Sequence, residues 1–532
     1  MAKSPALSGA QSVGRASLIT MLSLLGSRVL GILRDTIMAA QFGRGELTDA
    51  YTLAFQIPDL LFFLIAGGAL SSAFIPVFTE YLTTQRESEA WHIFSSVATI
   101  MASVLVLFIG VTFVFAEPIV ALMNGDAKTQ YFPLIAQMSR ILLPAQFAFF
   151  IGGLMFGTLY AHQRFSIPGL GPNIYNLGII FGAVVVSHFV APGIVGMAWG
   201  ALGGALIGNF LMPLWEMRKL GAQFKFSFDT RHPGVRKVFK LMLPVVLGLS
   251  LPGVYAMIMR YYGSHFEAGI VTSLDLANKL MQAPLGVFGQ AFAIAAFPAL
   301  SQFFAQGDMG RYREQLVRTL RMTVYVTVPV AALLGIMAPD VIQALLGYGK
   351  FRATDPSSVI FCLQVFAFGI PAWCLHPILM RGYFAMQNSV KPIALGTLTS
   401  GLFFGLCQVG LAMGMGWRGL PIASSISAWF LVTIMLVSLN KDAGGLNVQM
   451  FMSGLMKSLA AGAAFGLLVW LVAVLVPRGE MNTAGNLIAF ARLGVALALG
   501  GAVYHSITRA WGMAESDTLG RALSRFKRSA SA

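Results

Sequence analysis

The chain has 532 residues, of which 57% are hydrophobic and only 11% are charged, and its formal net charge is +15. A soluble domain usually carries roughly 25% charged residues. Apolar runs of about 20 residues, the length that crosses a ~30 Å hydrocarbon core, recur along most of the sequence. The composition therefore excludes a soluble globular protein and predicts a polytopic membrane protein.

The apolar runs, which are separated by charged or Pro/Gly-rich breaks, predict an all-α fold with about fourteen membrane-spanning helices. The first run is too long for the core of a signal peptide, so we interpret it as a retained span. The expected spans cover residues 17–40, 50–79, 93–116, 131–159, 170–189, 194–216, 238–260, 268–303, 319–338, 357–384, 392–413, 418–439, 451–476 and 484–507.

The first span carries ionisable residues near its middle, in the stretch SRVLGILRDTIMA. Arg28 and Asp35 are two turns apart and share a face, whereas Arg34 lies about 120° around the helix from Arg28. An ionisable group near the bilayer centre costs at least about 2.5 kcal/mol on insertion scales, so it usually faces a cavity or a partner. Either the arginines line a cavity, or Arg28 and Asp35 only neutralise each other in a packed bundle.

The second and eighth spans are unusually long, and both contain internal prolines, namely Pro58, Pro76, Pro284 and Pro298. A proline inside a membrane helix frees a backbone carbonyl and permits a bend. We therefore expect these two helices to move.

Lys279 lies a few residues before Pro284 in the eighth span, and Asp275 lies one turn before Lys279. Arg28, Arg34 and Lys279 together outnumber the carboxylates of Asp35 and Asp275. A cavity that holds these groups would attract an anion, and guanidinium groups suit phosphate because they donate in a planar fork. In the alternative interpretation, Lys279 and Asp275 only neutralise each other.

An internal repeat organises the helices. The stretch AFIPVFTEY begins at Ala73, and AAFPALSQF begins at Ala295, 222 residues later. YAHQRFSIP from Tyr160 and YFAMQNSVKP from Tyr383 match at almost the same offset, with one insertion. Two matches at one offset predict a duplication into two six-helix lobes of the same orientation, unless apolar helices align here by chance.

The repeat predicts the domain organisation. We expect an N-terminal lobe with helices 1–6 (residues 1–220), a cytoplasmic linker (221–240), a C-terminal lobe with helices 7–12 (241–440), two extra helices (441–510) and a cytoplasmic basic tail (511–532). In the sixth span, a four-residue ladder suits close helix packing and is formed by Gly196, Gly200, Gly204 and Gly208.

Lys and Arg are concentrated in the loops on the side of the N-terminus, above all between Arg218 and Lys240. This bias predicts that both termini are cytoplasmic. The basic charge then serves topology, and no nucleic-acid partner is expected. The opposite loops are expected to hold only Arg44, Lys128, Arg260, Lys350, Arg352, Arg418 and Arg478.

Other motifs are few. The sequence contains no HExxH, no GxSxG and no Gly-rich loop ending in GK[ST], so we predict neither an enzyme nor an ATP-driven pump. Cys362, Cys374 and Cys407 have no paired spacing and are expected to be packing residues. Arg140 and Arg492 each lie alone in a span, and we expect them to snorkel or to bond a backbone carbonyl.

Between about residue 17 and about residue 440 the sequence contains, in this order, SRVLGILRD, TDA, AFIPVFTEY, RFSIP, LANKLMQAPLGVFG and YGKF. These stretches resemble the MurJ (also called MviN) family. That family belongs to the multidrug/oligosaccharidyl-lipid/polysaccharide exporter superfamily and flips lipid II, the undecaprenyl-pyrophosphate-linked peptidoglycan precursor. The resemblance implies two lobes around a central cationic cavity and a final helix pair that forms a groove for the polyprenyl tail.

By position, the resemblance matches Arg28, Arg34 and Asp35 to the family's first-helix charges, Asp49 to a motif aspartate and Lys279 to a cavity arginine. The residues expected to bind pyrophosphate are therefore Arg28, Arg34 and Lys279. The residues expected to act in gating or coupling are Asp35, Asp49, Asp275, Pro58 and Pro284.

The resemblance also implies a multi-pass protein of the bacterial cytoplasmic membrane, without metal or cofactor. Its partners would be a lipid-linked anionic glycan and membrane lipids, and the expected state is a monomer that works beside cell-wall synthesis proteins. Sodium, protons or the membrane potential could each drive transport.

The chain departs from the family at several positions. Phe62 and Phe63 stand where the family commonly has two arginines, and Gly67 stands in place of a glutamate. The eighth span has Lys279 for arginine and Gln282 for an acidic residue. The reduced charge leaves open an O-antigen or capsule-type lipid-linked oligosaccharide flippase and, as a third alternative, a drug/cation antiporter of the same superfamily.

Overall fold

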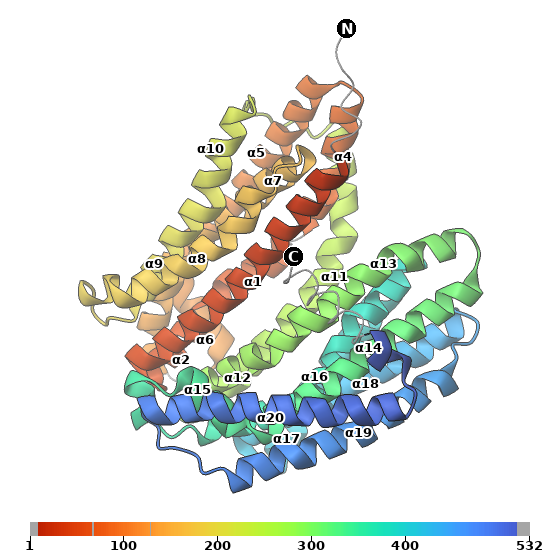
Figure 1. The fold of residues 1–532 in the computed structure, drawn as a ribbon. Coiled ribbons are helices and arrows are strands. Elements are labelled where there is room, and N and C mark those ends of the chain that lie inside the picture. Colours follow the sequence, from red (N-terminus) through yellow and green to blue (C-terminus); the bar gives the residue numbers. More distant parts are fainter. Residues whose placement is uncertain (1–8, 66–68, 128, 519–532) are drawn as a thin grey trace. The chain divides into compact units, whose positions relative to one another are not determined.

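The computed structural model describes residues 9–65, 69–127 and 129–518 (Figure 1). These residues form helices and no strands. Among them, 11 helices are long and apolar enough to cross a membrane. The first, second and seventh predicted spans lie outside those 11, and their described residues are also mainly helical. The all-α polytopic fold is confirmed, and a total of about fourteen spans is compatible with it.

The chain forms two compact units, residues 1–272 and 273–532. The N-terminal unit contains short 3₁₀ turns at Thr129–Tyr131 and Val186–His188 and a π turn at Leu206–Leu211. Its α-helices are α1 (Gly9–Phe42), α2 (Glu46–Ala54), α3 (Gln56–Ile65), α4 (Ala69–Thr83), α5 (Glu87–Val114), α6 (Ala116–Asn124), α7 (Phe132–Ala161), α8 (Ser166–Val184), α9 (Val195–Ala205), α10 (Met212–Lys219) and α11 (Pro233–Ser264).

Helix α8 packs against α1 on one side and against α9 on another. The contact between α8 and α9 is a backbone approach, because a Cβ atom added to Gly200 would overlap the backbone of Gly178 and Gly182. The glycine ladder predicted in the sixth span is therefore a packing surface.

The second predicted span is divided, because α2 ends at Ala54 and α3 begins at Gln56. Pro58 lacks the amide hydrogen that would bond to the carbonyl of Ala54, and its ring crowds that carbonyl. The hydroxyl of Ser139 on α7 donates a hydrogen bond of 2.9 Å to the same oxygen. The break is thus stabilised inside the unit rather than left unsatisfied.

Between α10 and α11 the chain is not helical, and part of it runs along α5. The amides of Lys225 and Ser227 donate to the hydroxyls of Ser95 and Thr99, over 3.1 and 3.3 Å. His92 Nε2 lies 3.0 Å from the Asp229 carboxylate, and this hydrogen bond is the main reason that the pKa of Asp229 lies below its ordinary value. The residue bounds that the sequence suggests for the two lobes and the linker between them stay predictions.

The C-terminal unit begins at Ser273, the fourth residue of α12. It contains a π turn at Leu285–Gly289 directly after Pro284, and 3₁₀ turns at Gly349–Ala353 and Gly416–Arg418. Its α-helices are α12 (Ile270–Pro284, shared with the first unit), α13 (Gln290–Ala305), α14 (Met309–Ile336), α15 (Ala338–Leu346), α16 (Ser357–Ala385), α17 (Val390–Ala412), α18 (Gly419–Asp442), α19 (Val448–Leu475) and α20 (Thr483–Ala510).

The internal repeat is visible in two pairs of helix ends. The second residue after the end of α7 and of α16 is a glutamine at positive φ, Gln163 (59°) and Gln387 (57°), in the second pair of matching stretches. Likewise α4 is followed by Gln85 and α13 by Gly307, again at positive φ and 222 residues apart. In each case the next amide bonds back to the helix in a Schellman motif. The duplication therefore extends to the helix caps.

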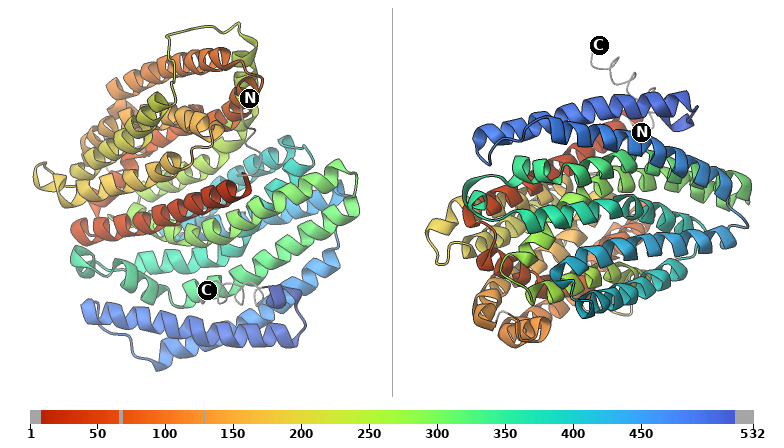
Figure 2. Two further views of the ribbon diagram at one scale, coloured as in Figure 1. Left: turned by 45° about the horizontal axis from the view of Figure 1, so that its top comes forward. Right: turned by 90° about the horizontal axis from the view of Figure 1, so that it is seen from below.

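The last two helices pack against each other and against α14 and α15 (Figure 2). Tyr325 of α14 and Tyr504 of α20 lie in one buried cluster with Phe465 of α19.

After α20, the described chain ends at residue 518, so most of the predicted basic tail lies outside the described residues. The three cysteines are buried and unpaired by disulfides, as packing residues would be.

Candidate functional site

The first-helix charges form a hydrogen-bonded cluster on α1 and α8. Arg34 Nη2 lies 2.9 Å from Asp35 Oδ1, and its Nη1 donates to Asn176 Oδ1 over 3.1 Å. The amide group of Asn176 in turn donates to the Ser27 carbonyl over 3.2 Å. The Arg34 side chain nevertheless keeps 19% of its surface exposed, and Arg28 is exposed. The fork of Arg34 is thus fixed in direction and still accessible.

Asp49 occupies a different environment, although it is also a predicted coupling residue. It lies on α2 and is completely buried. Its carboxylate accepts hydrogen bonds of 2.8 Å from the amides of Gly269 and Thr272 and of 2.7 Å from the Thr272 hydroxyl. The carboxylate therefore caps the first turn of α12, where it also complements the helix dipole.

On α12, Lys279 Nζ lies 2.7 Å from Asp275 Oδ2, so the ion pair anticipated as an alternative is formed. The pair is more open than that of Arg34, because 38% of the Lys279 side chain and 18% of the Asp275 side chain are exposed. Pro284 ends α12, and the π turn follows at once. The functional roles of all these residues stay predictions.

A third charged pair was not predicted. Arg260 Nη1 lies 2.7 Å from Asp59 Oδ2 and joins α11 to α3. The prediction that Arg260 lies in a loop is wrong, because α11 continues to Ser264. Phe62, one turn after Asp59, has 36% of its surface exposed. The side chain of Phe63 and the whole of Gly67 lie outside what the structure describes.

The two isolated arginines behave as expected. Arg140 Nε donates to the Phe113 carbonyl over 3.0 Å, and Arg492 Nη2 donates to the Ala473 carbonyl over 2.7 Å. Arg492 has in addition a buried partner, Asp340 of α15, whose Oδ1 lies 3.3 Å from Nε. Arg492 is therefore a packing element rather than part of an accessible site.

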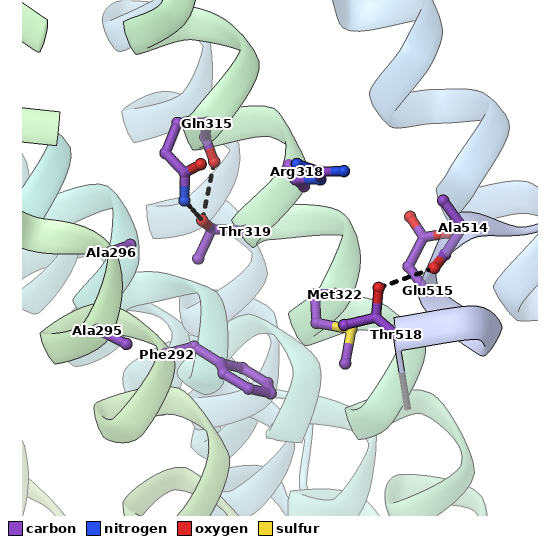
Figure 3. Close-up of a pocket in the computed structure, with 10 residues that line it drawn as sticks. All are labelled: Phe292, Ala295, Ala296, Gln315, Arg318, Thr319, Met322, Ala514, Glu515 and Thr518. Carbon is purple, nitrogen blue, oxygen red and sulfur yellow. Dashed lines mark hydrogen bonds between the residues drawn. The ribbon is translucent and has the colours of Figure 1, made fainter. Parts of the chain in front are cut away.

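The C-terminal unit holds a cavity of about 220 Å³ between α13, α14 and the segment after α20 (Figure 3). Phe292 and Met322 supply apolar surface, and Gln315 and Thr319 are hydrogen-bonded to each other along α14. The segment after α20 is held there by an ion pair of 2.6 Å between Arg321 and Glu515. The sequence reasoning did not anticipate this contact.

In the described part of the chain, no three His, Cys, Asp or Glu side chains gather as metal ligands would. The need for a coupling ion stays a prediction.

Two solved structures resemble this fold. One titled "Lipid II flippase MurJ, inward closed conformation" superposes with a TM-score of 0.73 at 20% identity, covering 92% of this chain and 99% of the other. An inward-facing multidrug resistance MATE transporter of the MOP superfamily gives 0.67 at 12% identity, covering 80% and 98%. The chain therefore has the same fold as these two proteins.

Sequence comparison is more specific. The family model described as lipid II flippase MurJ matches residues 38–485. The lipid II flippase MurJ of Burkholderia cenocepacia is 29% identical over 435 residues, which cover 80% of this chain and 84% of the relative. A probable lipid II flippase MurJ of Bdellovibrio bacteriovorus is 27% identical and covers 85% and 87%. The chain belongs to the MurJ family.

Proposed function

We propose that this chain moves lipid II across the bacterial cytoplasmic membrane, as a multi-pass protein whose two termini are cytoplasmic. The observation that carries the proposal is the match to the MurJ family model over residues 38–485. The accessible cation on α1 agrees with it, since lipid II carries a pyrophosphate between its lipid and its sugars.

Arg34 is the main phosphate-binding group in this proposal. Asp35 accepts from Nε and lies 2.9 Å from Nη2, and Asn176 accepts from Nη1, so the guanidinium is already ordered. Little side-chain entropy is therefore lost when its remaining N–H groups meet an anion. Charge-assisted hydrogen bonds of this kind contribute about 1.5 to 3 kcal/mol each. Arg28 and Lys279 add positive charge, and Lys279 does so by exchanging Asp275 for the phosphate.

Movement is assigned to the two proline-containing spans. The break after Ala54 and the π turn after Pro284 are places where a helix can bend at low cost, because the backbone is already irregular there. In this structure Asp49 of α2 holds the start of α12 through its hydrogen bonds to Gly269 and Thr272. Asp35, Asp49 and Asp275 are the carboxylates that a proton or sodium ion could use, and the membrane potential also acts on an anionic substrate.

The test is depletion of this chain in its native host, followed by measurement of the lipid II that is accessible at the outer face of the membrane. The accessible fraction should fall while total lipid II rises. Unchanged accessibility of lipid II, together with inward accumulation of another lipid-linked glycan, would contradict the proposal.

The orientation is tested with single cysteines in a chain whose three buried cysteines have been replaced. Arg478→Cys and Gln130→Cys should react with an impermeant thiol reagent in intact cells, whereas Arg231→Cys should react only after lysis. All three positions are exposed. Labelling of Arg231→Cys in intact cells would reverse the topology.

A further inference from the structure

A second cavity, of about 320 Å³, lies inside the N-terminal unit between α3, α7 and α8. Four aromatic side chains contribute to its walls, and the Phe149 and Tyr175 rings meet edge to face with centroids 5.1 Å apart. The side chains that matter for its chemistry are Phe55, Asp59, Phe62, Gln146, Phe149 and Tyr175. The size is at the lower end for small-molecule sites, which begin at about 300 Å³.

The polar groups of this cavity carry no net charge. The carboxylate of Asp59 is balanced by Arg260 at 2.7 Å. Gln146 on α7 is 94% buried, since 6% of its surface is exposed, and its Oε1 has no hydrogen-bond partner among the described residues. A buried amide oxygen without a partner costs about 1 to 3 kcal/mol, so it favours a ligand that can donate to it. The cavity suits a neutral polar ligand better than an anion.

The cavity lies near the arginine cluster of α1, because Tyr175, which lines the cavity, interacts electrostatically with Arg34. Tyr175, which lines it, directly precedes Asn176, whose Oδ1 accepts the hydrogen bond from Arg34. A ligand held by Arg34 through a phosphate would therefore bring the next chemical group of that ligand to the mouth of this cavity.

We propose that the cavity is a sugar subsite, which binds one pyranose ring of the substrate next to the pyrophosphate. This inference rests on the proposed function. The aliphatic face of a sugar ring packs on aromatic rings such as Phe62, Phe149 and Tyr175, whereas its hydroxyl and acetamido groups bond to carboxylate and amide groups such as Asp59 and Gln146. The volume has room for one ring and not for a complete disaccharide-peptide head group.

The subsite also gives a reason for the unusual residue at position 62. The family resemblance predicts an arginine there, but an arginine beside Asp59 and Arg260 would add charge to a cavity that is otherwise neutral. Phenylalanine instead supplies a flat, half-exposed apolar surface. This chain thus binds its substrate on this side by stacking on the sugar rather than by an additional phosphate contact.

The experiment compares two ligands that share the polyprenyl chain and the pyrophosphate, of which only one carries the disaccharide-peptide head group. Full-length protein in lipid nanodiscs is titrated with lipid II and with undecaprenyl pyrophosphate. Phe62→Leu and Gln146→Met should each weaken lipid II binding by about 3- to 10-fold. Binding of undecaprenyl pyrophosphate should stay unchanged in both variants. Phe62→Tyr, which keeps the ring, should bind lipid II as the wild type does.

Two controls separate this inference from the proposed function. Phe181→Leu, an exposed phenylalanine on α8 away from the cavity, should change neither affinity. Arg34→Ala should weaken both ligands, and wild-type protein that binds neither would overturn the proposed function itself. Unchanged lipid II binding by Gln146→Met and Phe62→Leu, or an equal loss for both ligands, would overturn the subsite. Gln146→Met nearly conserves the side-chain volume. If Phe62→Leu does not fold, the binding measurements on Gln146→Met alone test the subsite.

Discussion

The pair of Arg492 with Asp340 and the pair of Arg34 with Asp35 differ in how much of each solvent or a ligand can reach. In the pair of Arg492 and Asp340, the side chains are 3% and 4% exposed. In the pair of Arg34 and Asp35 they are 19% and 11% exposed. The sequence marks both arginines equally, as charges in apolar spans. Accessibility distinguishes a charge that holds helices together from a charge that can receive an anion.

Two further pairs extend the series toward the surface. Lys279 and Asp275 are 38% and 18% exposed, and His92 and Asp229 are 41% and 36% exposed. As exposure rises, the free energy that a pair contributes to folding should fall, because water screens the charges and competes for their hydrogen bonds. The series therefore ranks the expected effects of mutation.

The largest effect on stability is expected for Arg492→Leu. Removing one partner of a buried pair leaves an uncompensated carboxylate at Asp340 and costs about 3 to 5 kcal/mol. The amount of folded protein in membranes and its thermal unfolding in detergent measure this. The double variant Asp340→Asn with Arg492→Leu should be less destabilised, because no buried charge is then left alone. If Arg492→Leu is as stable as the wild type, Arg492 does not stabilise the packing of these helices.

Arg34→Ala should have the opposite profile, with folded protein retained and transport lost. Its charge-assisted hydrogen bonds to phosphate are worth about 1.5 to 3 kcal/mol each, or roughly 10- to 100-fold in affinity. Arg28→Ala should behave in the same way. The measurement is growth of a strain depleted of lipid II flippase, with membrane insertion as the control. If both variants are present at normal levels and support growth, neither arginine binds the pyrophosphate.

Lys279 should be intermediate. Lys279→Arg keeps the charge and the reach, so it should support growth, whereas Lys279→Glu should fail because it repels both the phosphates and Asp275. Lys279→Gln should fall between them. Growth and surface-exposed lipid II are the readouts. A functional Lys279→Glu protein would show that no cation is required on α12.

The smallest effect is expected for the exposed pair of His92 and Asp229. The pKa of Asp229 is lowered in the folded chain, so its contribution is present above the ordinary carboxyl pKa and is lost as the pH falls through the lowered value. Asp229→Asn should remove this acid-dependent step while leaving transport near neutral pH unchanged. The measurement is the rate of proteolysis within residues 220–232 as a function of pH, which should rise in acid in the wild type. Strong loss of transport would place this loop in the mechanism.

The helices were predictable because the membrane sets their length, and the repeat was predictable because both copies keep the same stretches at helix ends. The partners of the charges were not. Arg260 and Asp59 are 201 residues apart, and Arg34 and Asn176 are 142 apart, so nothing local in the sequence joins them. Pro58 predicted a freed carbonyl, but only the packing of α7 supplied Ser139 as its donor. The cavity of the proposed sugar subsite is built wholly from such distant contacts.

The cap that Asp49 forms on α12 has a consequence for how the molecule can open. Three donors surround a carboxylate that no water reaches in this state. Any motion that draws α2 away from the first turn of α12 strips a charged group of all three at once, which is prohibitive in a dry surrounding. The same motion becomes nearly neutral when water replaces the lost donors. A motion that separates α2 from the first turn of α12 therefore requires hydration of the Asp49 carboxylate.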